Sequence, residues 1–178
     1  VRPGDAFYIY AGSDDNNAVR TAAAAVEGST VRLSTPLRFS CRRSSAVVWH
    51  TGNVIYGENL SGVTVSDMKV VGGARGGFIA SHWLANTSIL LMGENLTVRN
   101  VTVSDSIADA ISLQSKGGFS VSGCRIDNTV LTGVHVGGTN TRDISITGNR
   151  IRRSGHYGIY LCNECRQLFR IVSPGKTH

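Results

Sequence analysis

One sequence pattern occurs three times, in LTVRNVTV at 96–103, FSVSGCRI at 119–126 and ISITGNRI at 144–151. Their apolar positions superimpose, and the copies begin 23 and then 25 residues apart. A second phrase follows each copy at the same spacings: DAISLQS from Asp109, TGVHVGG from Thr132 and YGIYLCN from Tyr157. Self-similarity at a period of roughly 20–25 residues is typical of solenoid proteins, in which each repeat packs only on its neighbours.

Each repeat has the composition of short β-strands. Between residues 95 and 161, apolar side chains alternate with Thr, Ser and Arg, and Gly, Asn, Asp or Ser bound each run. No helical spacing of apolar residues can be drawn through this stretch. Stacking the coils about 4.8 Å apart would align the inward side chains into continuous ladders. The sequence therefore predicts an all-β fold, a right-handed parallel β-helix with coils of about 23–25 residues.

The first 45 residues have a different pattern. In GSDDNNAVRTAAAAVEG, Asp14 or Asp15 can cap a helix that Gly28 would end, and Ala and Val residues lie on one face. We expect a short α-helix at about 15–27, followed by strands. Because the open end of a solenoid exposes strand edges and apolar side chains, we expect residues 1–45 to form an N-terminal cap.

The coils are predicted to occupy residues 46–172, with a tail at 173–178. About ten extra residues around 72–90 interrupt the repeat, and we expect an insertion there. Trp83 in this insertion either packs on the coil or offers a surface on which a sugar ring stacks. Since the chain starts at Val1 and its pattern ends abruptly, we expect it to be part of a longer protein.

Composition and charge narrow the classes of partner. With 41% hydrophobic and 17% charged residues, the 178-residue chain is globular. It has no apolar run of about 18 residues and no signal-peptide pattern, so no membrane insertion is predicted. The net charge of +6 suits nucleic acid or an acidic polysaccharide. Because no basic-aromatic nucleic-acid motif is present, we predict an acidic glycan and no nucleic acid.

Two further stretches carry a resemblance to a known superfamily. DDNNAVRTAA from Asp14 and GSTVRL from Gly28 resemble the opening of the pectate-lyase-like right-handed β-helices, in particular the tailspike polysaccharide depolymerases of bacteriophages. The resemblance implies an extracellular or virion-borne protein, a bacterial surface polysaccharide as partner and a homotrimer. ADAISLQS at 108–115 is similar to a polygalacturonase motif, but Ala108 replaces its first Asp, so no family's catalytic set is transferred.

The repeat register predicts a site on one outer face. If Ile111, Leu113 and their counterparts point inward, then Ser112, His135 and Tyr160 lie outward in adjacent coils and face solvent. Asp109 and Tyr157 border this column. It would supply the polar floor of a groove for an extended glycan, and we predict Ser112, Tyr157, Tyr160, Arg153 and Trp83 as substrate-binding residues.

Asp105 and Asp109 are the acid/base candidates. Glycosidic cleavage uses two carboxylates, and the turn SDSIAD could point both into one groove, with His135 from the next coil tuning them. We therefore predict Asp105, Asp109 and His135 as catalytic residues. The alternative is that both Asp residues cap turn amides. In a neighbouring outward file, Asp127 and Arg152 lie one coil apart, and we expect them to pair as an ordinary surface ion pair.

The four cysteines do not predict a metal site. Cys124 occupies an inward position and is expected to be a small core residue. Cys162 and Cys165 form a C-x-x-C, but Cys41 and Cys124 are isolated, so a second pair of metal ligands is missing. We predict no cofactor, with calcium required only by a pectate-type lyase.

The function predicted from these features is binding and cleavage of a bacterial surface glycan by an extracellular or virion-borne β-helix. Such an enzyme would be a glycoside hydrolase or a polysaccharide lyase. Two alternatives stay open at this point. One is a non-catalytic glycan-binding, structural or adhesion module of a tail fibre. The other is a secreted pectate-type lyase, which the scattered acidic residues favour less because calcium needs clustered carboxylates.

Overall fold

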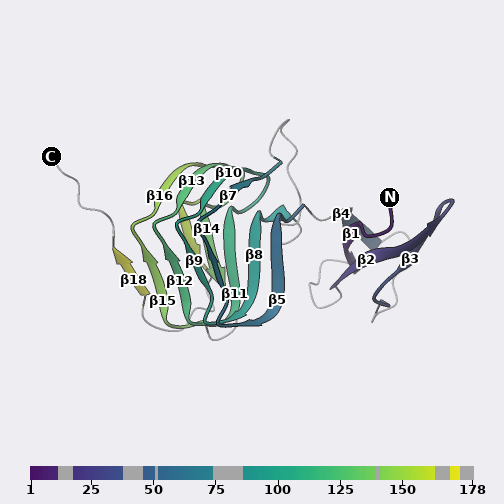
Figure 1. Cartoon of the computed structure of the whole chain (residues 1–178), viewed down its shortest axis with the longest axis horizontal. Coiled ribbons are helices and arrows are strands. Elements are labelled where there is room, and N and C mark those ends of the chain that lie inside the picture. Colours follow the sequence, from purple (N-terminus) through teal and green to yellow (C-terminus); the bar gives the residue numbers. More distant parts are fainter. Residues whose placement is uncertain are drawn as a thin grey trace. The chain divides into compact units, whose positions relative to one another are not determined.

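The chain forms two compact units, Val1–Thr51 and Gly52–His178, and all elements with described bounds are strands. The computed structural model describes residues 1–11, 18–37, 46–50, 52–73, 86–138, 141–162 and 169–172. Figure 1 shows the strands of each unit. In the described part of the chain, no helix is long and apolar enough to cross a membrane.

The first unit is a four-stranded antiparallel sheet in the order β3-β2-β1-β4. Its strands are β1 (Ala6–Ala11), β2 (Ala18–Glu27), β3 (Thr30–Leu33) and β4 (Ala46–His50). Phe7, Ile9 and Ala23 form a small buried core, against which Val19 and Val31 pack. This core is far smaller than that of the second unit.

The helix predicted at about 15–27 is wrong over its described part, because residues 18–27 form strand β2. β2 is hydrogen-bonded on both edges, to β1 and to β3, and Thr21 and Ala23 are buried on one face. Helix propensity is a weak prior that pairing of this kind overrides. Gly28 does end the element, with φ +58°, as the first residue of the two-residue hairpin turn before β3.

The second unit stacks successive coils into three parallel sheets, as Figure 1 shows. The sheets have the orders β17-β14-β11-β8-β5, β18-β15-β12-β9-β6 and β16-β13-β10-β7. The strands are β5 (Ile55–Ser61), β6 (Thr64–Ser66), β7 (Lys69–Val71), β8 (Ile89–Glu94), β9 (Thr97–Arg99), β10 (Thr102–Ser106), β11 (Ile111–Gly117), β12 (Phe119–Ser122), β13 (Arg125–Thr129), β14 (Val134–Gly137), β15 (Ile144–Thr147), β16 (Arg150–Ser154), β17 (Ile159–Leu161) and β18 (Phe169–Val172).

The repeat register predicted from the sequence is confirmed strand by strand. Val121 pairs with Val98 and Ile146, and the last coil continues the pattern with Phe169 beside Ile144. The inward residues of three sheets meet in one buried core, to which Cys124 belongs, as predicted. Burial raises the pKa of the Cys124 thiol. Most of the predicted insertion at 72–90, including Trp83, lies outside the described residues.

Turn residues with positive φ explain why Asn, Asp and Gly recur at the coil period. They form two columns at the turns between sheets and a third within β10, β13 and β16: Gly62, Asn95, Gly118 and Asp143; Asp67, Asn100, Gly123 and Gly148; and Asp105, Asn128 and Arg153. Left-handed backbone is open to Gly at little cost and to Asn and Asp at moderate cost. Gly, Asn and Asp in the first two columns therefore let the chain change sheets without a long loop.

Candidate functional site

Asp109 is held rigidly at the turn that leads into β11. Its side chain is 2% exposed, and Oδ1 accepts a hydrogen bond of 3.0 Å from the backbone N–H of Thr132 in the next coil. Its backbone carbonyl accepts a bond of 2.6 Å from Ser106, whose hydroxyl is in turn bonded by Ser88. The carboxylate therefore has one defined orientation.

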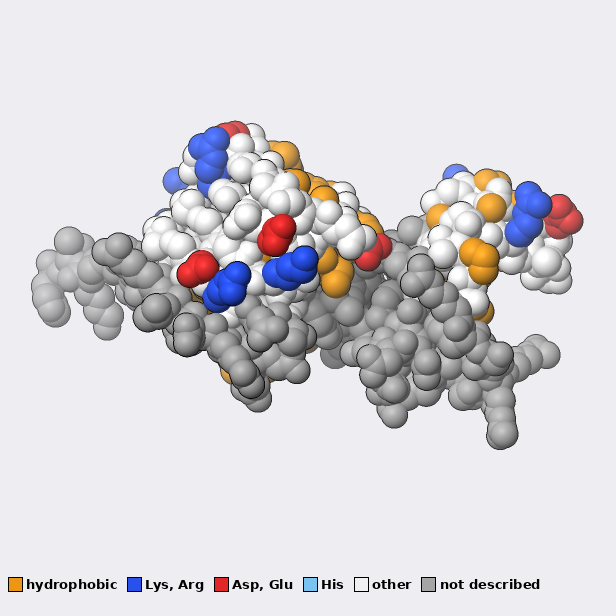
Figure 2. Space-filling model, turned by 90° about the horizontal axis from the view of Figure 1, so that it is seen from below, with side chains coloured by type: hydrophobic (Ala, Val, Ile, Leu, Met, Phe, Trp, Pro, Cys, Tyr) orange, Lys and Arg blue, Asp and Glu red, His pale blue; other side chains and the backbone are white. Residues whose placement is uncertain are grey.

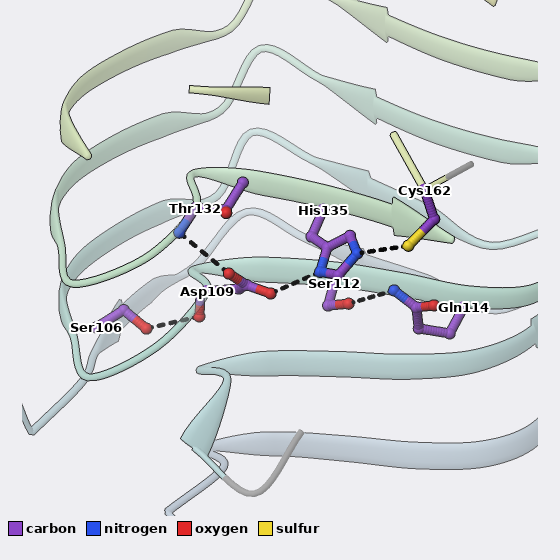
Figure 3. A network of polar contacts seen from close by, with 7 residues as sticks. All are labelled: Ser106, Asp109, Ser112, Gln114, Thr132, His135 and Cys162. Carbon is purple, nitrogen blue, oxygen red and sulfur yellow. Dashed lines mark hydrogen bonds and ion pairs between the residues drawn. The ribbon is translucent and has the colours of Figure 1, made fainter. Parts of the chain in front are cut away.

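The second carboxylate oxygen of Asp109 lies 2.8 Å from Nδ1 of His135 in β14. Because an ionised carboxylate only accepts hydrogen bonds, Nδ1 carries a proton and donates it to Asp109. The other ring nitrogen, Nε2, lies 3.3 Å from Sγ of Cys162, which directly follows β17. Figure 3 shows the row Asp109, His135 and Cys162, with one member from each of three successive coils.

An aromatic row leads from the surface to the imidazole. The ring of Tyr160 lies 5.0 Å from that of His135 at an interplanar angle of 53°. Tyr157 stacks on Tyr160 at 5.2 Å and 16°, and its side chain is 55% exposed. The outer member of the row exposes apolar ring surface, and its inner end is a group that can transfer protons.

The structure confirms the register of the predicted outward column, but the prediction that its side chains face solvent is wrong for Ser112 and His135. Ser112, His135 and Tyr160 pair across β11, β14 and β17, yet Ser112 is fully buried and His135 is 6% exposed. Side chains of the same face cover them. Tyr160 lies against His135, and Gln114 Nε2 donates a hydrogen bond of 2.8 Å to Ser112 Oγ. The sequence period reports the direction of a side chain and not what packs over it.

Asp105 and Asp109 take part in different networks. Asp105 lies in β10 with φ +56°, and its Oδ1 accepts a hydrogen bond of 2.6 Å from Asn128 at the equivalent position of β13 in the next coil. Asp109 is directed toward His135 instead. Of the three residues predicted to be catalytic, the structure thus brings Asp109 and His135 into contact and places Asp105 away from them, bonded to Asn128.

Arg153 is engaged in an ion pair. Its Nη2 lies 2.6 Å from Oδ2 of Asp127, whereas the sequence predicted that Arg152 would be the partner. Arg152 is in register with Asp127, but Arg153 has φ +51°, which turns its side chain off the strand line. Both members of the pair are well exposed, so it contributes only about 0–1 kcal/mol.

A polar groove that the sequence did not reveal runs along the C-terminal parts of β5, β8 and β11 and the residues that follow β8 and β11. It consists of two hollows of about 250 and 380 Å³ that share Glu94 and Lys116. The other lining residues are Glu58, Asn59, Met92, Gly93, Asn95, Ser115, Gly117, Gly118, Arg142 and Asp143. Figure 2 shows acidic and basic side chains next to one another on the surface of the coiled unit. Among the described residues, no group of three or more His, Cys, Asp or Glu could hold a metal ion.

Three parallel sheets that share the same coils define a parallel β-helix protein. The polar site described above lies on the outer face of one of these sheets. A family model described as the right handed beta helix region matches residues 80–171, just over half of the 178 residues, and the chain belongs to this family. The family includes enzymes that act on polysaccharides. No curated protein and no solved structure matches the chain.

Proposed function

We propose that this protein binds a polysaccharide on the outer face of the sheet β17-β14-β11-β8-β5 and cleaves its glycosidic bonds there. The observation that carries the proposal is the aromatic row of Tyr157, Tyr160 and His135, which ends on the carboxylate of Asp109. Membership of a family that includes polysaccharide-acting enzymes supports it.

The aromatic row suits a sugar ring. Tyr side chains combine a broad apolar face with a polar tip, and binding sites for small ligands pair such surfaces with a few polar groups. Tyr157 is exposed enough to receive a ring, and Tyr160 lies between Tyr157 and His135. A sugar bound on these rings would bring its reacting bond near the imidazole.

His135 is the proton-transfer group in this proposal. A positioned histidine contributes about 10²–10⁴-fold to a reaction that needs a proton moved. Asp109 fixes the ring and its tautomer, which leaves Nε2, the nitrogen beside Cys162 Sγ, to transfer the proton. The same imidazole could serve as a base that abstracts a proton next to a uronate carboxylate, or as an acid that protonates a leaving oxygen.

The polar groove gives an extended chain a path away from the rings. Lys116 lies four residues after Ser112 in β11, about 13 Å along the strand. The groove carries charges of both signs, with Lys116 and Arg142 beside Glu58, Glu94 and Asp143, so the preference for an acidic glycan rests on the net charge of +6. We propose a bacterial surface polysaccharide as substrate, and action outside the cell or on a virion. A homotrimer, which the tailspike resemblance implies, stays a prediction that sedimentation can test.

Digestion of capsular and lipopolysaccharide preparations tests the proposal. Release of reducing ends by the parent protein, and its loss in His135→Gln, is the expected result. A concomitant rise in ultraviolet absorbance would identify elimination, and its absence would identify hydrolysis. Binding without any release of reducing ends would overturn the catalytic proposal in favour of a glycan-binding module.

A further inference from the structure

We propose that Cys162, His135 and Asp109 form a nucleophilic triad that hydrolyses carboxylic esters through a thioester on Cys162. This activity goes beyond cleavage of glycosidic bonds and does not depend on it, because the reacting atom is a carbonyl carbon. The ester would join a small acid to an alcohol that carries a ring.

The geometry meets the needs of an activated thiol. A nucleophile requires a base within hydrogen-bond reach, and the base requires a third group that orients it. Nε2 of His135 lies 3.3 Å from Sγ of Cys162, and Nδ1 lies 2.8 Å from Asp109. Asp109 and His135 are 2% and 6% exposed, and low local polarity strengthens interactions between such groups.

A second cysteine in the same coils provides an internal comparison. Cys124 is buried in the core, where its Sγ lies 3.5 Å from the carbonyl oxygen of Ser122 and 3.7 Å from that of Val98. Carbonyl oxygens cannot remove its proton, and burial raises the pKa of this thiol. Cys162 is partly exposed and meets an imidazole nitrogen instead. The fold therefore places only one of these two thiols against a base.

Gly137 in β14 lets the thiol and the amide of Gln114 come close to the sheet. A Cβ at this position would lie 3.0 Å from Cys162 Sγ and 2.8 Å from Gln114 Oε1, closer than side chains pack. The amide of Gln114 donates one hydrogen to Ser112, and its second N–H is the donor we assign to the oxyanion of the carbonyl.

The reaction follows from this arrangement. His135 takes the thiol proton, Sγ attacks the ester carbonyl, and the bond to the alcohol oxygen breaks while the imidazolium returns the proton to that oxygen. The acyl group stays on Sγ as a thioester. Water then loses a proton to His135 and attacks the thioester carbonyl, the carbon–sulfur bond breaks, and the sulfur regains the proton. The products are one alcohol and one carboxylic acid. Tyr157 and Tyr160 would hold the ring of the alcohol.

The probe for the test is p-nitrophenyl acetate, which joins an acetyl group to an aryl alcohol. We expect a burst of one p-nitrophenol per chain, with the acetyl group on the peptide that contains Cys162. Cys162→Ala should abolish the burst, and His135→Gln should slow it about a hundredfold or more. Cys124→Ala is the matched control and should keep the full burst. A folded parent without a burst, or an unchanged burst in Cys162→Ala, would overturn the triad.

Alkylation by iodoacetamide at neutral pH tests the activation separately from turnover. Peptide mapping should show that Cys162 reacts at least about tenfold more slowly in His135→Gln than in the parent. Circular dichroism of each variant excludes unfolding as the cause. An equal alkylation rate in folded parent and variant would show that His135 does not activate the thiol. Neither assay contains polysaccharide, so failure here leaves the glycan proposal standing, and the reverse also holds.

Discussion

Asp109 and His135 face each other across one coil boundary, with Oδ2 of the carboxylate 2.8 Å from Nδ1 of the imidazole and both side chains buried. The two residues are 26 positions apart in the chain. Because the carboxylate is also bonded by the N–H of Thr132, it cannot turn away from the ring. The pair is the most constrained polar contact of the site.

Asp109→Asn should lower glycan cleavage about a hundredfold or more while the protein stays folded. The amide can still accept the bond from Thr132, but its NH₂ then faces Nδ1 and favours the wrong tautomer of His135. Reducing-end release and circular dichroism measure the two effects. Asp105→Asn is the matched control, since Asn suits its positive φ and can accept from Asn128. Loss of activity in that control instead would support a pair of catalytic carboxylates.

Tyr157→Ala should weaken glycan binding roughly fivefold, or about 1 kcal/mol, with less effect on turnover of bound substrate. The exposed ring of Tyr157 forms the outer end of the aromatic row. Isothermal titration calorimetry with a purified oligosaccharide measures the change. Tyr56→Ala provides the comparison, because β5 lies at the opposite edge of the same sheet. Equal losses in both variants would argue against the row as a sugar platform.

Val121→Ala should destabilise the protein by about 2–3 kcal/mol. Its side chain is fully buried in the ladder with Val98 and Ile146, so the deletion leaves a cavity between coils. Val71→Ala, at a position that is 51% exposed, should change the free energy of unfolding by less than about 0.5 kcal/mol. Chemical denaturation gives both values. Comparable effects would mean that the ladders do not form the core.

Gly155→Ala and Gly158→Ala should change the stability of the protein in opposite directions. A Cβ on Gly155 would lie 2.0 Å from the carbonyl oxygen of Val130, which is backbone of the previous coil and cannot move aside alone. A Cβ on Gly158 would meet nothing within 4 Å, so Ala there should stabilise by about 0.4–1 kcal/mol through the unfolded state. Thermal unfolding should show a lower midpoint for the first variant only. A lower midpoint for both would contradict the coil spacing.

Asn100→Gly should raise the pKa of Asp67 toward its ordinary value. Hydrogen bonds from the side chains of Ser66 and Asn100 hold this pKa below its usual range, and the positive φ of Asn100 accepts Gly, as at Gly123. A depressed pKa favours folding above the ordinary pKa, and the contribution disappears as the pH falls through the folded value. Nuclear magnetic resonance titration of the carboxylate measures the change. An unchanged titration would leave the hydrogen bond of Ser66 and the charge of Arg99 as the causes of the low pKa.

Sequence periodicity predicted the coils well because side-chain direction in a strand alternates with each residue. It placed His135 between Ser112 and Tyr160, as the structure has it. It did not predict strand β2, since Ala-rich segments have no strong β pattern and only pairing with neighbours decides their conformation. Burial of Ser112 depends on Gln114 and other side chains of the same face, which periodicity does not encode.

The sequence did not predict Cys162 as a site residue, because its C-x-x-C spacing to Cys165 is typical of metal or redox motifs. The repeats themselves contain a pattern that could have identified it. The alignment of TGVHVGG with YGIYLCN places Cys162 opposite Gly137, two residues from the column of His135 and on the same outer face. A glycine opposite a cysteine, two residues from a histidine, indicates a thiol that can pack closely beside the imidazole. The 3.3 Å contact itself requires the rotamers of both side chains.

Each coil is hydrogen-bonded only to the coils before and after it. The distance between two residues of the site is therefore set by the number of coils that separate them. A whole extra coil inserted ahead of β11 would lengthen the solenoid and leave the three successive coils of the site untouched. The same insertion between β11 and β14 would move Asp109 away from His135 by about 4.8 Å and separate them. Duplication of repeats ahead of β11 can therefore extend the binding surface while the chemistry stays fixed in the coils of β11, β14 and β17.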